Sequence, residues 1–252
     1  MAVRTPSGAE LTVLDDTVIK VHAPRTDPVT LALRLRVADQ LAQFVPPLQS
    51  ELQQRPDGRV VTVWPRVEVA AEDDPVLPWA EAGALLARLH RTAVPPGLPR
   101  HGWPDRVARA RSRAPAELAG LGAELQRSVV RPEPDVLVHG DWHLGQLGRW
   151  MDEWRLLDID DLGVGDPAWD LARPAGFWAC GLLPDEDWTA FLDAYRAAGG
   201  TAVRADGDPW PALEMPARCA VFVAAVRSSN SLDPHGHATA SALVEACRRM
   251  AQ

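Results

Sequence analysis

Residues 138–170 hold more groups able to do chemistry than any other stretch of the chain. Their carboxylate, imidazole and amide side chains include His139, Asp141, His143, Gln146, Asp158, Asp160, Asp161, Asp166 and Asp170. The apolar run 136–138 predicts a short strand that ends just before Asp141. Phosphoryl transfer needs one carboxylate beside the attacking hydroxyl, and hard oxygen ligands that hold magnesium against nucleotide phosphates. The cluster by itself also allows a solvated acidic loop.

A predicted β-hairpin brings two of these oxygen donors together. Its strands are LGRW and WRLLDI, and the turn lies at Met151-Asp152-Glu153. Partners across an antiparallel pair lie about 5 Å apart. Gln146 and Asp158 are therefore expected to meet at one end of the hairpin, with Asp141 just upstream.

These motifs resemble a known family. HGDWHLGQ, followed by LLDIDDLGVGDPAWDLA, is similar to the catalytic and metal loops of aminoglycoside phosphotransferases, choline kinases and maltokinase-like small-molecule kinases. The resemblance implies that Asp141 is catalytic, that Asp158 binds Mg2+ and that His139 braces the loop. Gln146 stands where most members have Asn, as in the maltokinase-like branch, and its amide oxygen keeps metal binding open. The resemblance also implies ATP or GTP as co-substrate.

The fold implied is α+β and protein-kinase-like, with two lobes. We expect a reduced, β-rich nucleotide-binding lobe over residues 1–69, a linker over 70–78 and a helical lobe over 79–252. The strand that ends at Trp64 should lead into the hinge past the nucleotide base. Its residues Trp64, Arg66, Val67 and Glu68 would offer backbone groups there.

Lys20 is the only lysine in the chain and lies in the β-branched run TVIKVH, which pairs by pattern with ELTVLD. A strand lysine can reach nucleotide phosphates as a compact point charge, although a lone strand lysine can also simply face solvent. Two departures from the family pattern accompany it. Only Ser7-Gly8 offers a glycine-rich loop. The predicted helix 28–44 has Asp39 as its one acid, so the usual lysine partner is in doubt and Lys20 is left to pair with Asp158.

Several polar residues have a structural alternative to a functional role. Asp166-Pro167 has the form of a helix N-cap followed by proline, so Asp166 is expected to be architectural, and Asp170 is expected to tie down the same loop. His90 ends a predicted helix and favours a capping or surface position. For Asp160 and Asp161 two roles stay equally open: they could bind cationic groups of the substrate, or they could simply face solvent.

The acceptor pocket is expected among the C-terminal helices. Its candidate acids and stacking platforms are Asp185, Glu186, Asp187, Asp208, Glu214, Trp178 and Trp210.

Composition excludes several classes of protein. A net charge of −8 argues against nucleic-acid binding. No apolar run approaches the roughly 18 residues of a membrane span, and no signal peptide opens the chain. Three scattered cysteines form no metal spacing. These observations lead us to expect a cytoplasmic protein with no nucleic-acid or membrane partner.

The pattern as a whole predicts an enzyme that moves the γ-phosphoryl of ATP or GTP to a hydroxyl of an aminoglycoside, an amino sugar or a sugar. Two alternatives stay open. A nucleotide-binding pseudokinase with a regulatory role would fit the reduced N-terminal lobe. A metal-dependent phosphohydrolase would use the same acids and histidines.

Overall fold

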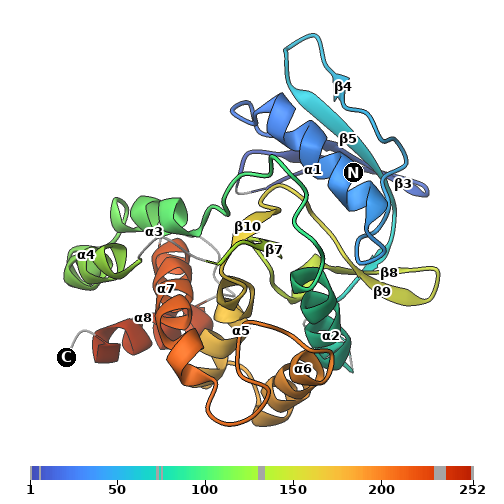
Figure 1. Cartoon of the computed structure of the whole chain (residues 1–252). Coiled ribbons are helices and arrows are strands. Elements are labelled where there is room, and N and C mark those ends of the chain that lie inside the picture. The colour runs from blue at the N-terminus through green and yellow to red at the C-terminus, as the bar shows by residue number, and fades with distance from the viewer. Residues whose placement is uncertain are drawn as a thin grey trace.

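The computed structural model describes residues 2–5, 7–71, 74, 76–129, 134–229 and 237–250. An antiparallel sheet from the N-terminal part of the chain stands above a mostly helical C-terminal part, and two small sheets lie between them (Figure 1). The α+β class and the kinase-like arrangement predicted from the sequence are confirmed. The boundaries 1–69, 70–78 and 79–252 stay a prediction, and residues 72, 73 and 75 of the expected linker lie outside the described residues.

The N-terminal sheet has the order β1-β2-β3-β5-β4. Its strands are β1 (Ala2–Arg4), β2 (Glu10–Leu14), β3 (Thr17–Val21), β4 (Gln53–Gln54) and β5 (Val60–Pro65). The predicted pairing of β2 with β3 is observed, and β3 pairs in turn with β5, with Lys20 opposite Thr62. Alternating β-branched residues suit such a half-buried sheet.

Helix α1 (Pro28–Gln40) covers this sheet (Figure 1). Asp27 caps it by accepting a hydrogen bond from the Thr30 backbone N–H, and Pro28 fits the first turn, where its missing N–H costs nothing. The helix ends before the predicted residue 44. The chain turns extended at Leu41, so that Phe44 bridges to Leu156 in the C-terminal part and Val45 donates to the Leu156 carbonyl.

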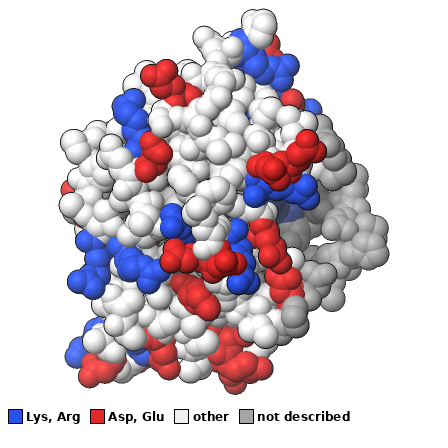
Figure 2. Space-filling view, turned by 90° about the vertical axis from the view of Figure 1, so that its right-hand side faces the viewer, with Lys and Arg blue, Asp and Glu red and all other residues white. Residues whose placement is uncertain are grey.

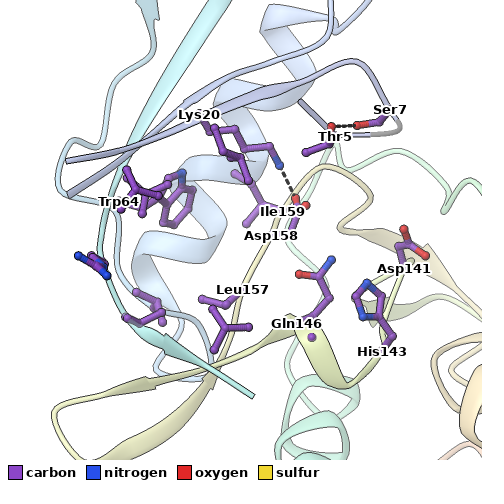
Figure 3. Close-up of a pocket in the computed structure, with 18 of the residues that line it drawn as sticks. Thr5, Ser7, Lys20, Trp64, Asp141, His143, Gln146, Leu157, Asp158 and Ile159 are labelled. Atoms are coloured by element: carbon purple, nitrogen blue, oxygen red, sulfur yellow. Dashed lines mark hydrogen bonds and ion pairs between the residues drawn. The ribbon is translucent and has the colours of Figure 1, made fainter. Parts of the chain in front are cut away.

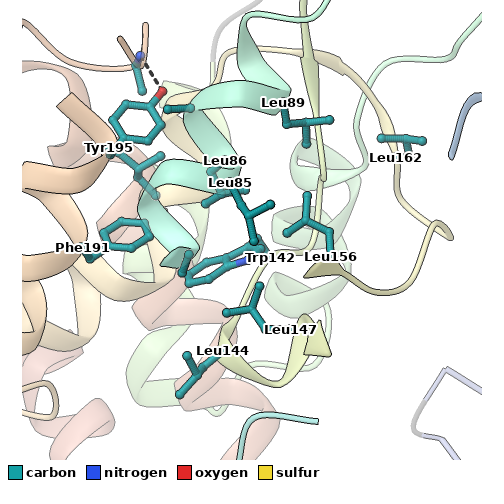
Figure 4. Packing of buried hydrophobic residues seen from close by; sticks show 14 of the residues in the cluster. Leu85, Leu86, Leu89, Trp142, Leu144, Leu147, Leu156, Leu162, Phe191 and Tyr195 are labelled. Atoms are coloured by element: carbon teal, nitrogen blue, oxygen red, sulfur yellow. Dashed lines mark hydrogen bonds between the residues drawn. The ribbon is translucent and has the colours of Figure 1, made fainter. Parts of the chain in front are cut away.

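Helices make up most of the C-terminal part. They are α2 (Trp79–His90), α3 (Trp103–Arg111), η1 (Ala116–Leu118), α4 (Ala119–Ser128), η2 (Leu144–Gln146), α5 (Ala168–Ala179), α6 (Asp185–Ala197), α7 (Trp210–Ser229) and α8 (His237–Met250). Leu85, Leu86 and Leu89 of α2 pack with Phe191 of α6 and with Trp142 (Figure 4). Trp142 and Phe191 stack at 5.3 Å between ring centroids. Because Trp142 directly follows Asp141, this core fixes the loop that carries the predicted catalytic acid.

Two small sheets carry the polar loops. One pairs β7 (Val136–Val138) with β10 (Gly163–Gly165), and the other has the order β6-β8-β9, from β6 (Glu68–Val69), β8 (Leu147–Trp150) and β9 (Glu153–Leu156). The predicted hairpin is therefore observed. Met151 and Asp152 at its turn have φ of 49° and 64°, the left-handed values that a tight two-residue hairpin turn requires.

Charge is mixed over the face shown in Figure 2. Acidic and basic side chains lie next to one another there, and no broad area of one sign covers the face. Within the ranges described, no helix has both the length and the apolar character needed to cross a membrane.

Candidate active site

A cleft of about 630 Å³ opens between the N-terminal sheet and the hairpin β8–β9. Figure 3 shows Trp64 toward one end, Asp141 and His143 toward the other, and Lys20, Asp158 and Gln146 between them. Thus the lysine from the sheet and the oxygen donors from the later loops line one cavity.

The Lys20 side chain points from β3 to two carboxylates. Its Nζ lies 2.8 Å from Asp158 Oδ1 and 2.9 Å from Asp160 Oδ2, and the residue is only 9% exposed. Burial alone would lower the pKa of Lys20, but the charges of Asp158 and Asp160 and their hydrogen bonds outweigh burial and raise it. Lys20 is therefore held as a charged ammonium at the middle of the cleft.

Asp160 takes the place of the acid that α1 does not supply. Besides Lys20 it contacts the buried His22, whose Nδ1 lies 3.0 Å from Asp160 Oδ1 and whose Nε2 lies 2.8 Å from Thr62 Oγ1. Burial would raise the pKa of Asp160, but the Lys20 charge and the hydrogen bond and charge of His22 lower it well below its usual range. Helix α1 contributes Arg34 instead, which donates to the backbone carbonyls of Asp160 and Leu162.

Asp158 occupies a strained backbone position. Its φ is 58°, a region that few residues other than glycine adopt, and its own Oδ1 accepts a hydrogen bond of 2.9 Å from the Asp160 backbone N–H. The hairpin register, with Leu147 opposite Leu156 and the Leu157 N–H donating to the Gln146 carbonyl, keeps Gln146 beside this turn. Asp158 and Gln146 both line the cleft.

The donor chemistry of these two side chains is compatible with a magnesium ion. No cluster of three or more His, Cys, Asp or Glu side chains able to hold a metal occurs among the described residues. Mg2+ usually takes one or two protein ligands and completes its coordination with phosphates and water. Asp158 and Gln146 would provide two oxygen ligands, which agrees with this coordination preference, whereas a structural zinc site would need four protein ligands.

Asp141 follows a glycine that the loop cannot replace. Gly140 has φ of 84°, and a Cβ there would run into the backbone carbonyl of Asp161. Asp141 Oδ1 then accepts hydrogen bonds from Arg106 at 2.9 Å and Arg173 at 3.3 Å. Arg106 also donates to Asp161 Oδ2 at 3.0 Å. The two guanidinium groups fix the orientation of the Asp141 carboxylate at the edge of the cleft.

A fully buried network supports this loop from below. Asp170 has no exposed surface and accepts from the backbone N–H groups of His139 at 2.6 Å and Gly140 at 2.8 Å. His139 bonds to the Leu157 carbonyl at 2.7 Å and thereby links the Asp141 loop to the Asp158 turn. Burial would raise the pKa of Asp170, but the hydrogen bond and charge of His90, with further contributions from His139 and Gly140, lower it.

His90 is not the capping or surface residue expected from the sequence. It is 4% exposed and lies between Asp170, at 3.0 Å from Nε2, and the Tyr195 hydroxyl, at 2.7 Å from Nδ1. His90 follows Leu86 by four positions and so lies on the apolar face of α2. This spacing in the sequence could have indicated that His90 is buried and therefore needs hydrogen-bond partners.

The remaining predicted residues fall in several places. Asp166 accepts from the Ala168 backbone N–H at 2.9 Å, at the start of α5. Trp64, Arg66 and Val67 line the cleft, and the Arg66 N–H is already bonded to the Asp16 carbonyl. Glu68 lies outside the cleft lining, exposed on β6.

The acids expected in an acceptor pocket do not line this cleft. Asp185 accepts from Trp178 Nε1, Asp208 caps the start of α7, and Glu214 lines a separate hollow beside α7. Trp178 and Trp210 stack on each other at 5.8 Å between ring centroids. Sequence patterns also missed the arginines Arg106, Arg173 and Arg227, which the fold gathers around Asp141 and His143 from three different helices.

The fold and the cleft together define a small-molecule kinase-like protein, in which a lysine from a small sheet faces acidic loops of a helical part. The model of the phosphotransferase enzyme family matches residues 7–213, and the chain belongs to this family. A search of curated protein sequences gave no match.

Solved structures share the fold at low sequence identity. A choline/ethanolamine kinase family protein from Mesorhizobium loti is 17% identical, with a TM-score of 0.65 over 99% of this chain and 87% of that one. An amicoumacin kinase in complex with AMP-PNP and Ca2+ is 14% identical, with a TM-score of 0.65 over 99% and 84%. The GDP complex of an aminoglycoside 2'-phosphotransferase is 16% identical, with a TM-score of 0.61 over 96% and 89%.

Proposed function

We propose that this phosphotransferase moves the γ-phosphoryl group of ATP or GTP to a hydroxyl of a small polar molecule. The observation that carries the proposal is the contact of 2.8 Å between Lys20 Nζ and Asp158 Oδ1 inside a cleft that Gln146 and Asp141 also line. A cation for phosphates, oxygen ligands for a metal and a carboxylate for the acceptor are the parts that phosphoryl transfer requires.

The nucleotide would lie along the cleft with its base toward Trp64, Arg66 and Val67 and its phosphates at Lys20. Support comes from relatives whose structures hold AMP-PNP with Ca2+ or GDP. Thr5 and Ser7, joined by a hydrogen bond of 2.8 Å between their hydroxyls, line the cleft from the short loop between β1 and β2. This loop would stand in for a glycine-rich phosphate loop.

Asp158 and Gln146 would hold Mg2+. When bound, the ion neutralises charge on the phosphate oxygens. With Asp158 turned to the metal, Asp160 would keep Lys20 in place.

Asp141 would orient the acceptor hydroxyl. The hydroxyl oxygen forms a bond to the γ-phosphorus while the bond from that phosphorus to the β–γ bridging oxygen breaks, and the nucleoside diphosphate leaves. The hydroxyl proton passes to the Asp141 carboxylate and then to solvent. General-base placement of this kind contributes typically about 10²–10⁴-fold. Arg106 and Arg173 hold the carboxylate in one orientation for this step.

The test is Mg2+-dependent turnover of ATP and GTP with a panel of small hydroxylated molecules that includes sugars, amino sugars, aminoglycosides, sugar acids and sugar phosphates. Phosphorylated acceptor should appear with the wild type and with Asp152→Asn, a control in the exposed hairpin turn. It should fall to background with Asp141→Asn.

The same measurements separate the two alternatives. Nucleotide binding without turnover on any acceptor would favour a pseudokinase. Phosphate release from substrates with no nucleotide present, unchanged by Lys20→Ala, would favour a phosphohydrolase.

A further inference from the structure

Positive charge gathers at the end of the cleft where Asp141 lies. Arg227, in the last turn of α7, lines the cleft and acts through its charge on Arg173. Arg173 of α5 and Arg106 of α3 do not line the cleft but pair with Asp141. Within the described part of the chain, Asp141 and Asp158 are the carboxylates among the lining residues. Asp141 is already engaged by two arginines. A polycationic acceptor such as an aminoglycoside would find few free carboxylates here.

Arg227 is the cation of this group that is free to meet a ligand. It is exposed, it lines the cleft, and no ion pair or hydrogen bond joins its guanidinium to any side chain of the described residues. Arg106 and Arg173 are instead only 14% and 24% exposed and are both committed to Asp141. Arg227 therefore offers a guanidinium, unpaired among the described residues, to the same cleft that Asp141 lines.

Arg173 registers the excess of positive charge around it. Burial lowers its pKa first, and the charges of Arg106 and Arg227 lower it further against the opposing effect of Asp141. A negative group placed among these side chains would relieve their mutual repulsion.

We propose that the acceptor carries an anionic group, a carboxylate or a phosphate ester near the reacting hydroxyl, which Arg227 binds with Arg173 behind it. This inference rests on the proposed phosphotransfer and narrows its acceptor to hydroxylated acids or phosphate esters. The anionic group itself is unchanged in the reaction. Guanidinium suits this task because its planar fork matches both carboxylate and phosphate oxygens.

The experiment measures acceptor binding with Mg2+ and AMP-PNP already bound, so that the sites for nucleotide phosphates are filled. The probes are matched sets that differ in charge: glycerate and gluconate as carboxylates, glycerol phosphate as a phosphate ester, glycerol and glucitol as neutral counterparts, and glucosamine as a cation. The variants are Arg227→Gln, Arg227→Glu and the control Arg109→Gln. Arg109 lies in the last turn of α3, is exposed and does not line the cleft.

We expect at least one anionic probe to bind about tenfold more tightly than its neutral counterpart, which is the size expected for one charged hydrogen bond. The preference should vanish in Arg227→Gln, persist in Arg109→Gln and shift toward glucosamine in Arg227→Glu. The carboxylate and phosphate arms identify which anion is preferred.

Equal binding of anionic and neutral probes would overturn the proposal, as would a preference that survives Arg227→Gln. A loss of AMP-PNP affinity in Arg227→Gln would also overturn it, because the arginine would then serve the nucleotide. Turnover of a neutral or cationic acceptor without any anion preference would leave the proposed phosphotransfer standing. If the wild type binds no nucleotide, the proposed phosphotransfer itself is overturned.

Discussion

Replacing Asp160 with asparagine removes one of the two carboxylates that hold the Lys20 ammonium. At 2.9 Å and an effective dielectric constant of about 20, the Coulomb attraction in this pair is roughly 6 kcal/mol. Desolvation and solvent screening offset much of it, since the Asp160 side chain is 29% exposed and Asp158 stays in contact with Lys20. We expect a loss of about 1–3 kcal/mol in the free energy of unfolding, which is the cost of leaving one buried hydrogen-bonding group without its partner.

The assay is a double-mutant cycle by urea denaturation. Asp160→Asn, Lys20→Met and the double variant are compared with the wild type, and Asp152→Asn serves as a control because its side chain is 97% exposed. The coupling energy between Lys20 and Asp160 should be about 1–3 kcal/mol, whereas the control should change by about 0.5 kcal/mol or less. A coupling energy below about 0.3 kcal/mol, the error of additivity, would refute the pairing.

The contribution of Asp160 to the free energy of unfolding should also depend on pH. Because the folded protein lowers the pKa of Asp160, its contribution is complete above the unfolded value of about 3.9 and is lost as the pH falls toward the folded value. Asparagine does not titrate. The stability difference between wild type and Asp160→Asn should therefore be full at neutral pH and shrink below about pH 4. A difference that grew on acidification would contradict the assignment.

Three further predictions concern the surrounding loops and core. Asp141→Asn should lower kcat by about 10²–10⁴-fold, while the affinity for Mg2+·AMP-PNP measured by calorimetry stays within error of the wild type. A large loss of that affinity would contradict the assignment of Asp141 to the acceptor. Asp170→Asn should cost about 3 kcal/mol in urea denaturation, because an amide NH2 would face the N–H of His139 or Gly140 in a site without solvent; a neutral result would exclude the network as a support. Gly83→Ala should lower Tm by several degrees in calorimetry, because its Cβ would run into the Phe191 carbonyl where α2 packs on α6. An unchanged Tm would contradict the close packing of these two helices.

Much of the fold could be predicted from local sequence patterns. The β2–β3 pair and the β8–β9 hairpin follow from alternating apolar residues and turn chemistry, which need only neighbouring residues. The end of α1 did not follow, because Phe44 and Val45 leave the helix to pair with Leu156, far along the chain. A helical period cannot reveal such a long-range competitor.

The site divides in the same way. The spacing from Asp141 to Gln146 and Asp158 was visible in the sequence, and the hairpin register explains why Gln146 and Asp158 lie together. The pairing of Lys20 with Asp158, 138 positions away, was expected because the predicted helix offered no usual acidic partner, and the structure shows it. The other partners of these groups were not visible in the sequence. Arg106 and Asp141, for example, are 35 positions apart and meet only through the packing of the helices, which spacing along the chain does not reveal.

Calorimetric titration with AMP-PNP, with and without Mg2+, tests the central claim most directly. The wild type should bind the nucleotide much more tightly when Mg2+ is present. Lys20→Met should weaken that binding, and Asp158→Asn should remove its dependence on Mg2+. If both variants bind AMP-PNP with the affinity and Mg2+ dependence of the wild type, the meeting of Lys20 and Asp158 is not a nucleotide site.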